Sequence, residues 1–261
     1  MFDQAKKVTL KEVAKLANVS HTTVSNVLNN TGSVSEETRL RVLEAIKTLN
    51  YEQNVLARSL KTRKSRVLGV VISDNSNPLF SLVVKGVEKI ATKRNYNVIL
   101  CNTDQDVERE IRQIKMLYER QVDGIIISLA KERTDHLARY INRKPFVFIN
   151  RLPDRMFGDT ILTDNFQGGY EVVSHLLSLG HRRIGIFGCS TEYITGRERY
   201  RGYLAALREY QVEPDPALVV QTHFRAAQEA FEPALSFLEK AKPTAVFGSK
   251  ARNFHSGLLL A

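Results

Sequence analysis

The spacing of apolar residues changes at Val67, and this change limits the chain to a fold with two differently built parts. After Val67, short continuous apolar runs alternate with stretches whose apolar residues recur at helical spacing. Continuous apolar runs are typical of strands that are covered on both faces. Strands that alternate with helices of about ten or more residues indicate a doubly wound parallel sheet. The larger part of the chain is therefore predicted to be α/β.

This alternation of strands and helices occurs twice. The first run predicts strands at 67–73, 97–101, 124–128 and 146–150, and it ends in an irregular stretch at 151–159. The second run predicts strands at 184–187, 218–221 and 244–247, with helices near 165–179, 197–210 and 226–240. We expect two α/β subdomains, 67–160 and 161–249, with a cleft between them that holds a small ligand.

Residues 9–50 contain no strand-like run and divide into three short helical patterns. Thr9 and Glu12 form a capping box at the start of the first pattern. Ser20 and Ser35 offer N-caps for the second and third patterns. Two short helices joined by a tight turn match a helix-turn-helix, and the third helix completes a small core.

Basic residues concentrate toward the same end of the chain. Residues 1–66 hold 12 basic and 6 acidic side chains, so they contribute +6 to the net charge of +10. Five of these basic residues fall within nine positions: Arg58, Lys61, Arg63, Lys64 and Arg66. A solvated linker would explain such a run. A polyanionic partner is the more specific explanation.

Seven short motifs follow one another in a fixed order. They are residues 9–29 (TLKEVAKLANVSHTTVSNVLN), 54–61 (NVLARSLK), 77–80 (NPLF), 122–126 (VDGII), 164–165 (DN), 180–184 (GHRRI) and 243–247 (PTAVF). Each of them alone is a weak signal, but the ordered set resembles the lactose/galactose repressor family of bacterial transcription regulators. The resemblance extends over roughly residues 8–249.

The resemblance implies an α + α/β chain with two domains. Residues 8–64 would form a helix-turn-helix DNA-binding headpiece and a hinge helix. Residues 65–261 would form an incomplete effector-binding and dimerisation domain like the periplasmic binding proteins. A member of this family is expected to be a cytoplasmic, nucleoid-associated repressor. It would bind a pseudo-palindromic operator as a homodimer and respond to a sugar-like or other small-molecule effector.

The second helix carries the predicted base contacts. The resemblance assigns base reading to His21, Thr22 and Asn26, and an asparagine can bond adenine at two points. Ser20, Thr23 and Ser25 are interpreted as cap residues or phosphate contacts. An ordinary solvated polar face is the alternative for this surface.

The predicted hinge helix supplies the second group of DNA contacts. The resemblance places Ala57, Arg58, Leu60 and Lys61 there, with Leu60 as an apolar wedge that bends the duplex from its minor groove. Such a short basic segment is marginal as a free helix, and the resemblance implies that it becomes helical only on DNA. Leu60 could instead be a buried anchor of the linker. The chain has Gln53 where family members often have proline, so its hinge should be less preorganised.

The sequence predicts only part of the effector site. The resemblance places four residues near the cleft, with the arginine as partner for an anionic or hydroxyl-bearing effector: Leu79, Phe80, Asp164 and Arg199. Phe80 also fits the core face of its helix. Arg197 and Arg201 flank Arg199 closely enough to be mistaken for it.

Other classes of protein fit poorly. The chain contains no nucleotide-binding glycine motif and no nucleophile-elbow motif, and its six histidines lack metal-ligand spacing. We therefore expect no enzyme activity, cofactor or metal. Cys101 and Cys189 do not suggest a disulfide framework, and no apolar run approaches the ~20 residues of a membrane span. A solute-binding module without DNA function would leave residues 1–66 unexplained.

The last twelve residues depart from the family pattern. Residues 250–261 lack the acidic stretch and further helix that the resemblance implies, so we expect a truncated or out-of-frame end. Such an end would expose sheet edges and apolar surface. It would also remove contacts that oppose Leu79 and Arg199 across the cleft. DNA binding without an effector response is therefore a third functional hypothesis.

Overall fold

The computed structural model describes residues 8–51, 64–141, 143–155, 158–221 and 228–249. The chain divides into two compact units, Met1–Ser65 and Arg66–Ala261. None of the described helices is both long and apolar enough to cross a bilayer.

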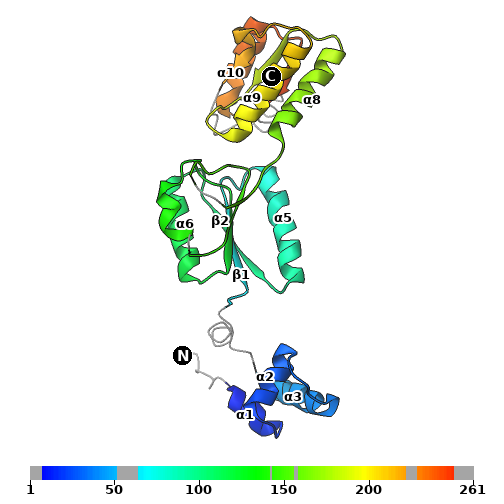
Figure 1. Ribbon diagram of the computed structural model, residues 1–261, viewed down its shortest axis with the longest axis vertical. Helices are drawn as coiled ribbons and strands as arrows, with labels where there is room; N and C mark the ends of the chain where they lie inside the picture. The colour runs from blue at the N-terminus through cyan, green and yellow to red at the C-terminus, as the bar shows by residue number, and fades with distance from the viewer. Residues whose placement is uncertain (1–7, 52–63, 142, 156–157, 222–227, 250–261) are drawn as a thin grey trace. The chain divides into compact units, whose positions relative to one another are not determined.

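The first unit consists of three helices, as the sequence predicts: α1 (Leu10–Leu16), α2 (His21–Asn29) and α3 (Glu36–Thr48) (Figure 1). Each helix begins where a polar side chain precedes it. The Thr9 amide donates to Glu12 Oε2 at 2.7 Å, and the Ser20 and Ser35 hydroxyls accept from the amides of Thr23 and Thr38. Valines and alanines from all three helices form the core: Val13, Ala14, Ala17, Val24, Val27, Val42 and Ala45.

The second unit begins with a parallel sheet and the helices that cover it. We call this part the first lobe. Its elements are β1 (Val67–Ile72), α5 (Pro78–Lys93), β2 (Asn97–Asn102), α6 (Val107–Glu119), β3 (Gly124–Ile127), the 3-10 turn η1 (Asp135–Leu137), α7 (Ala138–Ile141), β4 (Phe146–Ile149) and β5 (Asp159–Ile161). The described strands lie in the order β2-β1-β3-β4-β5 and all pairs are parallel. Helices α5 and α6 cover opposite faces of this sheet, which confirms the doubly wound prediction (Figure 1).

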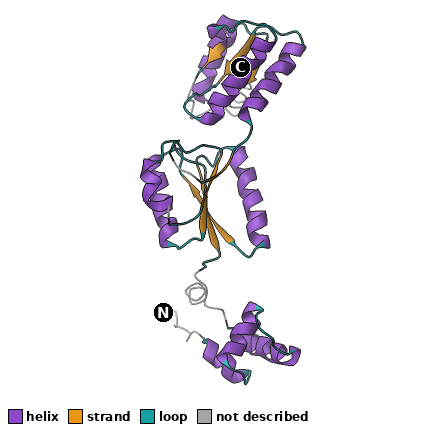
Figure 2. Cartoon of the chain, in the orientation of Figure 1, coloured by secondary structure: helices purple, strands orange, loops and turns teal. Residues whose placement is uncertain are grey.

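The second lobe repeats this arrangement on a smaller scale. It contains α8 (Asn165–Ser178), β6 (Ile184–Phe187), α9 (Ile194–Glu209), η2 (Pro216–Leu218), β7 (Val219–Val220), α10 (Gln228–Ala241) and β8 (Ala245–Gly248). Its described strands are parallel and lie in the order β7-β6-β8. Helices lie in front of these strands in Figure 2. Helices α8 and α9 enclose one core with β6, and α10 encloses another.

Strand β5 begins at the last residue of the stretch that the sequence indicates as irregular, and the sequence predicts no strand there. It has three residues, and its single apolar side chain, Ile161, is 64% exposed. It pairs with β4 at the edge of the sheet, with Thr160 opposite Phe148. A short polar edge strand of this kind has no apolar period to detect. The strand also carries the sheet of the first lobe one residue beyond the expected boundary at 160.

Candidate DNA-binding helix and effector cleft

The N-terminal end of α2 presents polar side chains to solvent. His21 and Thr22 are exposed, while Val24 and Val27 on the opposite face are buried in the core of the unit. This arrangement follows from the sequence, because apolar residues at spacing three or four occupy one helix face. The exposed end also carries the positive end of the helix dipole, which favours an anion nearby.

Ser20 and Thr23 close the first turn of α2. The Thr23 amide donates to Ser20 Oγ at 3.1 Å, and the two hydroxyls lie 2.9 Å apart. Ser25 is half-buried, and its carbonyl oxygen accepts from Asn29 Nδ2 at 2.7 Å. These contacts account for Ser20 and Thr23 as cap residues without any ligand.

Asn26 lies one turn further along α2 and is half-buried against the following turn. Its Oδ1 accepts from Thr31 Oγ1 at 3.5 Å, a weak bond. Gly32 approaches it so closely, at φ +72°, that a β-carbon there would lie 2.8 Å from Asn26 Nδ2. The side chain is thus held in place by the turn, and its amide keeps hydrogen-bonding capacity for a base edge.

The predicted hinge contacts cannot be placed. Ala57, Arg58, Leu60 and Lys61 lie outside the described residues, as do residues 250–261. These assignments therefore stay predictions.

A cavity of about 370 Å³ lies between the two lobes of the second unit. Residues of both lobes line it: Ser73, Asp74, Asn77, Leu79, Phe80, Gln105, Lys131, Asn150, Arg151, Gly188, Ser190, Glu192, Tyr193, Thr195, Gly196, Arg199 and Ser249. Several of these residues directly follow strands β1, β4, β6 and β8. The carboxyl ends of parallel strands are the usual ligand site of open α/β sheets. We call this cavity the effector cleft.

Arg199 is the arginine of its cluster that lines the effector cleft. Its Nε donates to Asn165 Oδ1 at 2.8 Å and its Nη1 donates to the Ser249 carbonyl oxygen at 2.6 Å. Burial lowers the pKa of the guanidinium from its ordinary value. Arg197 instead pairs with Glu132, and Arg201 pairs with Glu198. Three-dimensional position thus separates three arginines that the sequence leaves equivalent.

Of the other predicted effector residues, two line the cleft and one does not. Leu79 is 40% exposed and lines the cleft. Phe80 lines it too, yet the ring is 2% exposed and packs with Val70 and Ile72, so the ring serves the core as well. Asp164 is absent from the lining of the cleft. Its carboxylate accepts from the Gln167 amide at 2.9 Å and caps α8, which explains the residue without an effector.

Arg151 and Tyr193 are cleft residues that the sequence analysis missed. The Arg151 side chain is buried, and its Nη1 donates to the carbonyl oxygens of Leu129 and Ala130 at 2.5 and 2.6 Å. Its guanidinium carbon lies 3.7 Å from the centre of the Tyr193 ring. Burial lowers the pKa of this guanidinium. The position of Arg151 just after a buried strand was the available signal.

The described residues contain no cluster of three or more metal-ligating side chains. Cys101 and Cys189 are both free and buried. Burial raises the pKa of the Cys189 thiol to about 11 and raises that of Cys101 as well. Neither thiol is therefore suited to act as a nucleophile at neutral pH.

The chain is similar to known proteins along both units. Residues 9–54 match the family described as bacterial regulatory proteins, lacI family. Residues 65–256 match the periplasmic binding proteins and sugar binding domain of LacI family. The HTH-type transcriptional repressor PurR of Aliivibrio fischeri (strain MJ11) is 35% identical over 244 residues, which cover 92% of this chain and 72% of that repressor. The HTH-type transcriptional regulator DegA of Bacillus subtilis (strain 168) is 33% identical with the same coverage.

Solved structures agree with these matches. The lac repressor dimer bound to operator and the anti-inducer ONPF superposes with a TM-score of 0.81 at 25% identity, covering 98% of this chain and 78% of that one. The complex of the transcriptional regulator CelR with cellobiose gives a TM-score of 0.64 at 28% identity, with coverage of 97% and 77%.

Proposed function

Because the chain belongs to the LacI family of bacterial regulatory proteins, we propose that it is a repressor whose headpiece binds operator DNA and whose effector cleft binds a small molecule. Residues 8–64 would carry the DNA-binding headpiece and hinge, and residues 65–261 the effector-binding and dimerisation domain. The observation that carries this proposal is the exposed polar end of α2, which lies on a three-helix core in the same chain as a two-lobed ligand domain. Within the hinge, Leu60 remains our candidate for the wedge in the minor groove.

The proposal predicts that α2 reads bases. His21→Ala and Asn26→Ala should each weaken operator binding by about 1–3 kcal/mol, roughly 5- to 150-fold, at the one base pair that the residue contacts. The operator is first selected from a random DNA pool, and affinities are then measured by mobility shift on single-base variants. Thr48→Ala, an exposed change at the end of α3, is the control and should bind normally. Equal losses on every sequence would mean that the two residues contact only phosphates.

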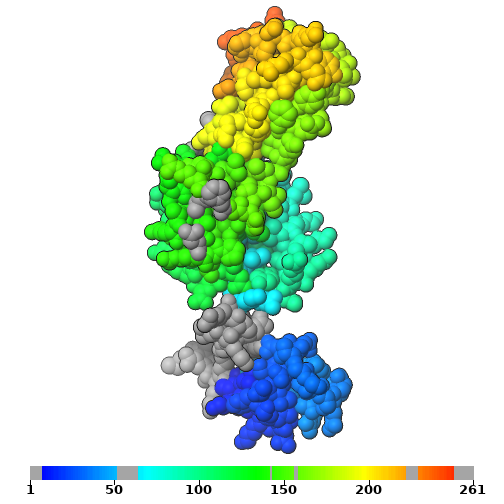
Figure 3. Space-filling view, in the orientation of Figure 1, coloured from blue at the N-terminus to red at the C-terminus, as the bar shows by residue number. Residues whose placement is uncertain are grey.

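We further propose that the chain acts as a homodimer through α5 and β2. Leu82 on α5 is 69% exposed, Ile90 on the same helix 51%, and Leu100 on the edge strand β2 50%. Helix α5 packs against strand β2, and its outer face lies at the surface of the first lobe (Figure 3). Large exposed apolar side chains that gather on one surface are typical of a subunit interface. A dimer would place two headpieces on the two halves of a palindromic site.

This interface is sensitive to a single buried charge. Leu82→Asp should convert the dimer to a monomer at micromolar concentration, because an unpaired carboxylate would be buried when two copies associate. Sedimentation equilibrium measures the change. Val172→Asp places the same charge on α8, where the side chain is 45% exposed, and should leave the dimer intact. A monomeric wild-type chain, or a dimeric Leu82→Asp variant, would exclude this surface.

The effector is proposed to be a sugar, a sugar derivative or another small polar molecule. The polar lining of the cleft supports this class, as does the binding of cellobiose and ONPF by the two structural relatives named above. Release of operator DNA by a panel of sugars, sugar acids and nucleobases tests it. Any response should be lost in Arg199→Met, which keeps an unbranched apolar stem and removes the guanidinium donors.

We infer no catalytic role, since the relatives are transcriptional regulators. A regulator of bacterial genes would work in the cytoplasm, at the nucleoid. A solute-binding module without DNA function is the alternative, and failure of the chain to select any DNA sequence would favour it.

A further inference from the structure

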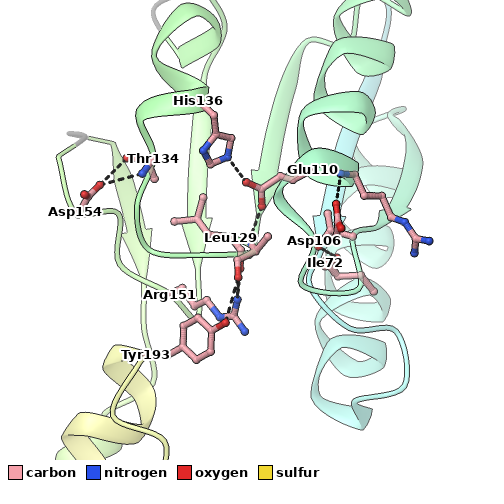
Figure 4. Close-up of polar contacts among 12 residues, drawn as sticks. Ile72, Asp106, Glu110, Leu129, Thr134, His136, Arg151, Asp154 and Tyr193 are labelled. Atoms are coloured by element: carbon pink, nitrogen blue, oxygen red, sulfur yellow. Dashed lines mark hydrogen bonds and ion pairs between the residues drawn. The ribbon is translucent and has the colours of Figure 1, made fainter. Parts of the chain in front are cut away.

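The loop after β3, residues 129–134, is held firmly against the first lobe (Figure 4). The buried Glu110 carboxylate accepts from the Ala130 amide at 2.5 Å and from His136 Nε2 at 2.7 Å. From the other side, Arg151 donates to the carbonyl oxygens of Leu129 and Ala130. The start of the loop, Leu129 and Ala130, is thereby fixed by two buried side chains.

Asp154 secures the remainder of this loop. Its Oδ1 accepts from the amide and the hydroxyl of Thr134, at 3.1 and 2.9 Å. Its own amide donates to the carbonyl oxygen of Glu132 at 2.9 Å. The backbone of Glu132 is therefore preorganised by the first lobe before its side chain makes any contact.

The Glu132 side chain crosses to the second lobe. Its Oε1 accepts from the Ile194 amide at 2.5 Å, and its Oε2 accepts from Arg197 Nη2 at 2.8 Å. The side chain is only 15% exposed. Charge-assisted bonds in such a sheltered position are stronger than surface ion pairs.

These bonds fall on the first turn of α9. The N-cap residue Tyr193 makes no side-chain hydrogen bond to the turn. A carboxylate at a helix N-terminus satisfies a free amide and interacts favourably with the helix dipole. Glu132 thus caps α9 from the other lobe.

The capped turn also supplies much of the second lobe's side of the effector cleft. Tyr193, Thr195, Gly196 and Arg199 line the cleft, whereas Glu132 does not. Besides the Arg151 guanidinium over the Tyr193 ring, two weaker contacts join the lobes at the same place. Lys131 Nζ lies 3.9 Å from Glu192 Oε1, and Tyr193 Oη donates to the Ala130 carbonyl oxygen at 3.4 Å.

We propose that Glu132 is a positioning residue for the effector cleft. By capping α9 across the lobes, it fixes the lining residues of the second lobe relative to those of the first. A ligand that contacts both lobes then meets an assembled site, because the cap has already stabilised the arrangement that the ligand requires. The regulatory part of this inference rests on the proposed effector function, while the positional part stands on the contacts alone.

The experiment measures the separation of the lobes in the chain of residues 1–261. Spin labels are placed at Arg112→Cys on α6 and Arg208→Cys on α9, both exposed positions, and labelled chains are diluted with unlabelled ones. Cys101 and Cys189 are buried and should not take up label. We expect one narrow distribution of spin-label distances for the chain with Glu132 intact. Glu132→Ala should give a broadened and shifted distribution. The melting temperature should fall by roughly 3–8 °C.

Two further variants make the outcome specific. Glu132→Gln keeps an acceptor for the Ile194 amide and loses the charge opposite Arg197, so its distribution should lie between those of wild type and Glu132→Ala. Glu198→Ala removes an ion pair within α9, to Arg201 at 2.8 Å, and should leave the distance unchanged. An unchanged distribution in Glu132→Ala, or an equal change in Glu198→Ala, would overturn the proposal. Failure of operator binding by the wild-type chain would refute the proposed function and would leave the distance result standing.

Discussion

Replacement of Gly202 by alanine is expected to destabilise the second unit by about 3 kcal/mol or more. A β-carbon at Gly202 would lie 2.3 Å from the Phe166 carbonyl oxygen and 2.6 Å from the Tyr170 amide nitrogen. On the facing helix, a β-carbon at Gly169 would lie 2.5 Å from the Arg199 carbonyl oxygen. Helices α8 and α9 therefore cross backbone against backbone. A methyl group can be accommodated only if the two helices separate, because no flexible side chain can move aside.

Gly168→Ala on α8, the helix that faces Gly202, is the control. A β-carbon there would meet no atom within 4 Å. Since alanine favours a helix over glycine by up to about 1 kcal/mol, this variant should be neutral or slightly stabilised. The chain has no tryptophan, so urea unfolding is followed by circular dichroism. Similar midpoints for the two alanine variants would show that the α8–α9 contact tolerates the added volume.

Glu110→Ala is expected to cost about 3 kcal/mol in the free energy of unfolding. The carboxylate is fully buried, and its removal leaves the buried Ala130 amide and the 15%-exposed His136 ring without their acceptor. When one partner of a buried pair is deleted, the other stays buried without a hydrogen-bond partner. This destabilises the folded state. The loop that carries Glu132 should become less ordered in this variant. The distance distribution between the lobes should therefore broaden, as in Glu132→Ala.

Two other variants separate this role from the general effect of changing α6. Glu108→Ala removes an exposed carboxylate from the same helix and should stay within about 0.5 kcal/mol of wild type. Glu110→Gln retains an acceptor oxygen and should lose less than alanine does. A double-mutant cycle with His136→Ala should give a coupling energy of about 0.5–3 kcal/mol. A coupling energy near zero would mean that the Glu110–His136 contact contributes nothing to the stability of the loop.

Local features of the sequence determined most of the secondary structure. Ser20 and Ser35 cap helices through bonds to residues three positions away, so the information lies within one turn. The apolar run at β1 needs no partner to be recognised as a buried strand. The ordered motifs then identified the family and, with it, the pairing of a DNA-binding headpiece with a ligand domain.

Tertiary structure alone decided the residues of the cleft and its supports. Arg197, Arg199 and Arg201 are alike in sequence, but helical rotation sends them to Glu132, the cleft and Glu198 respectively. Asp164 caps its own helix, a local role that the family pattern hides, whereas β5 is a strand only through its pairing with β4. The bond from Glu132 to Arg197 joins residues 65 positions apart. Periodicity reports which face of an element is buried, whereas the packing of two lobes decides which side chains from distant segments meet.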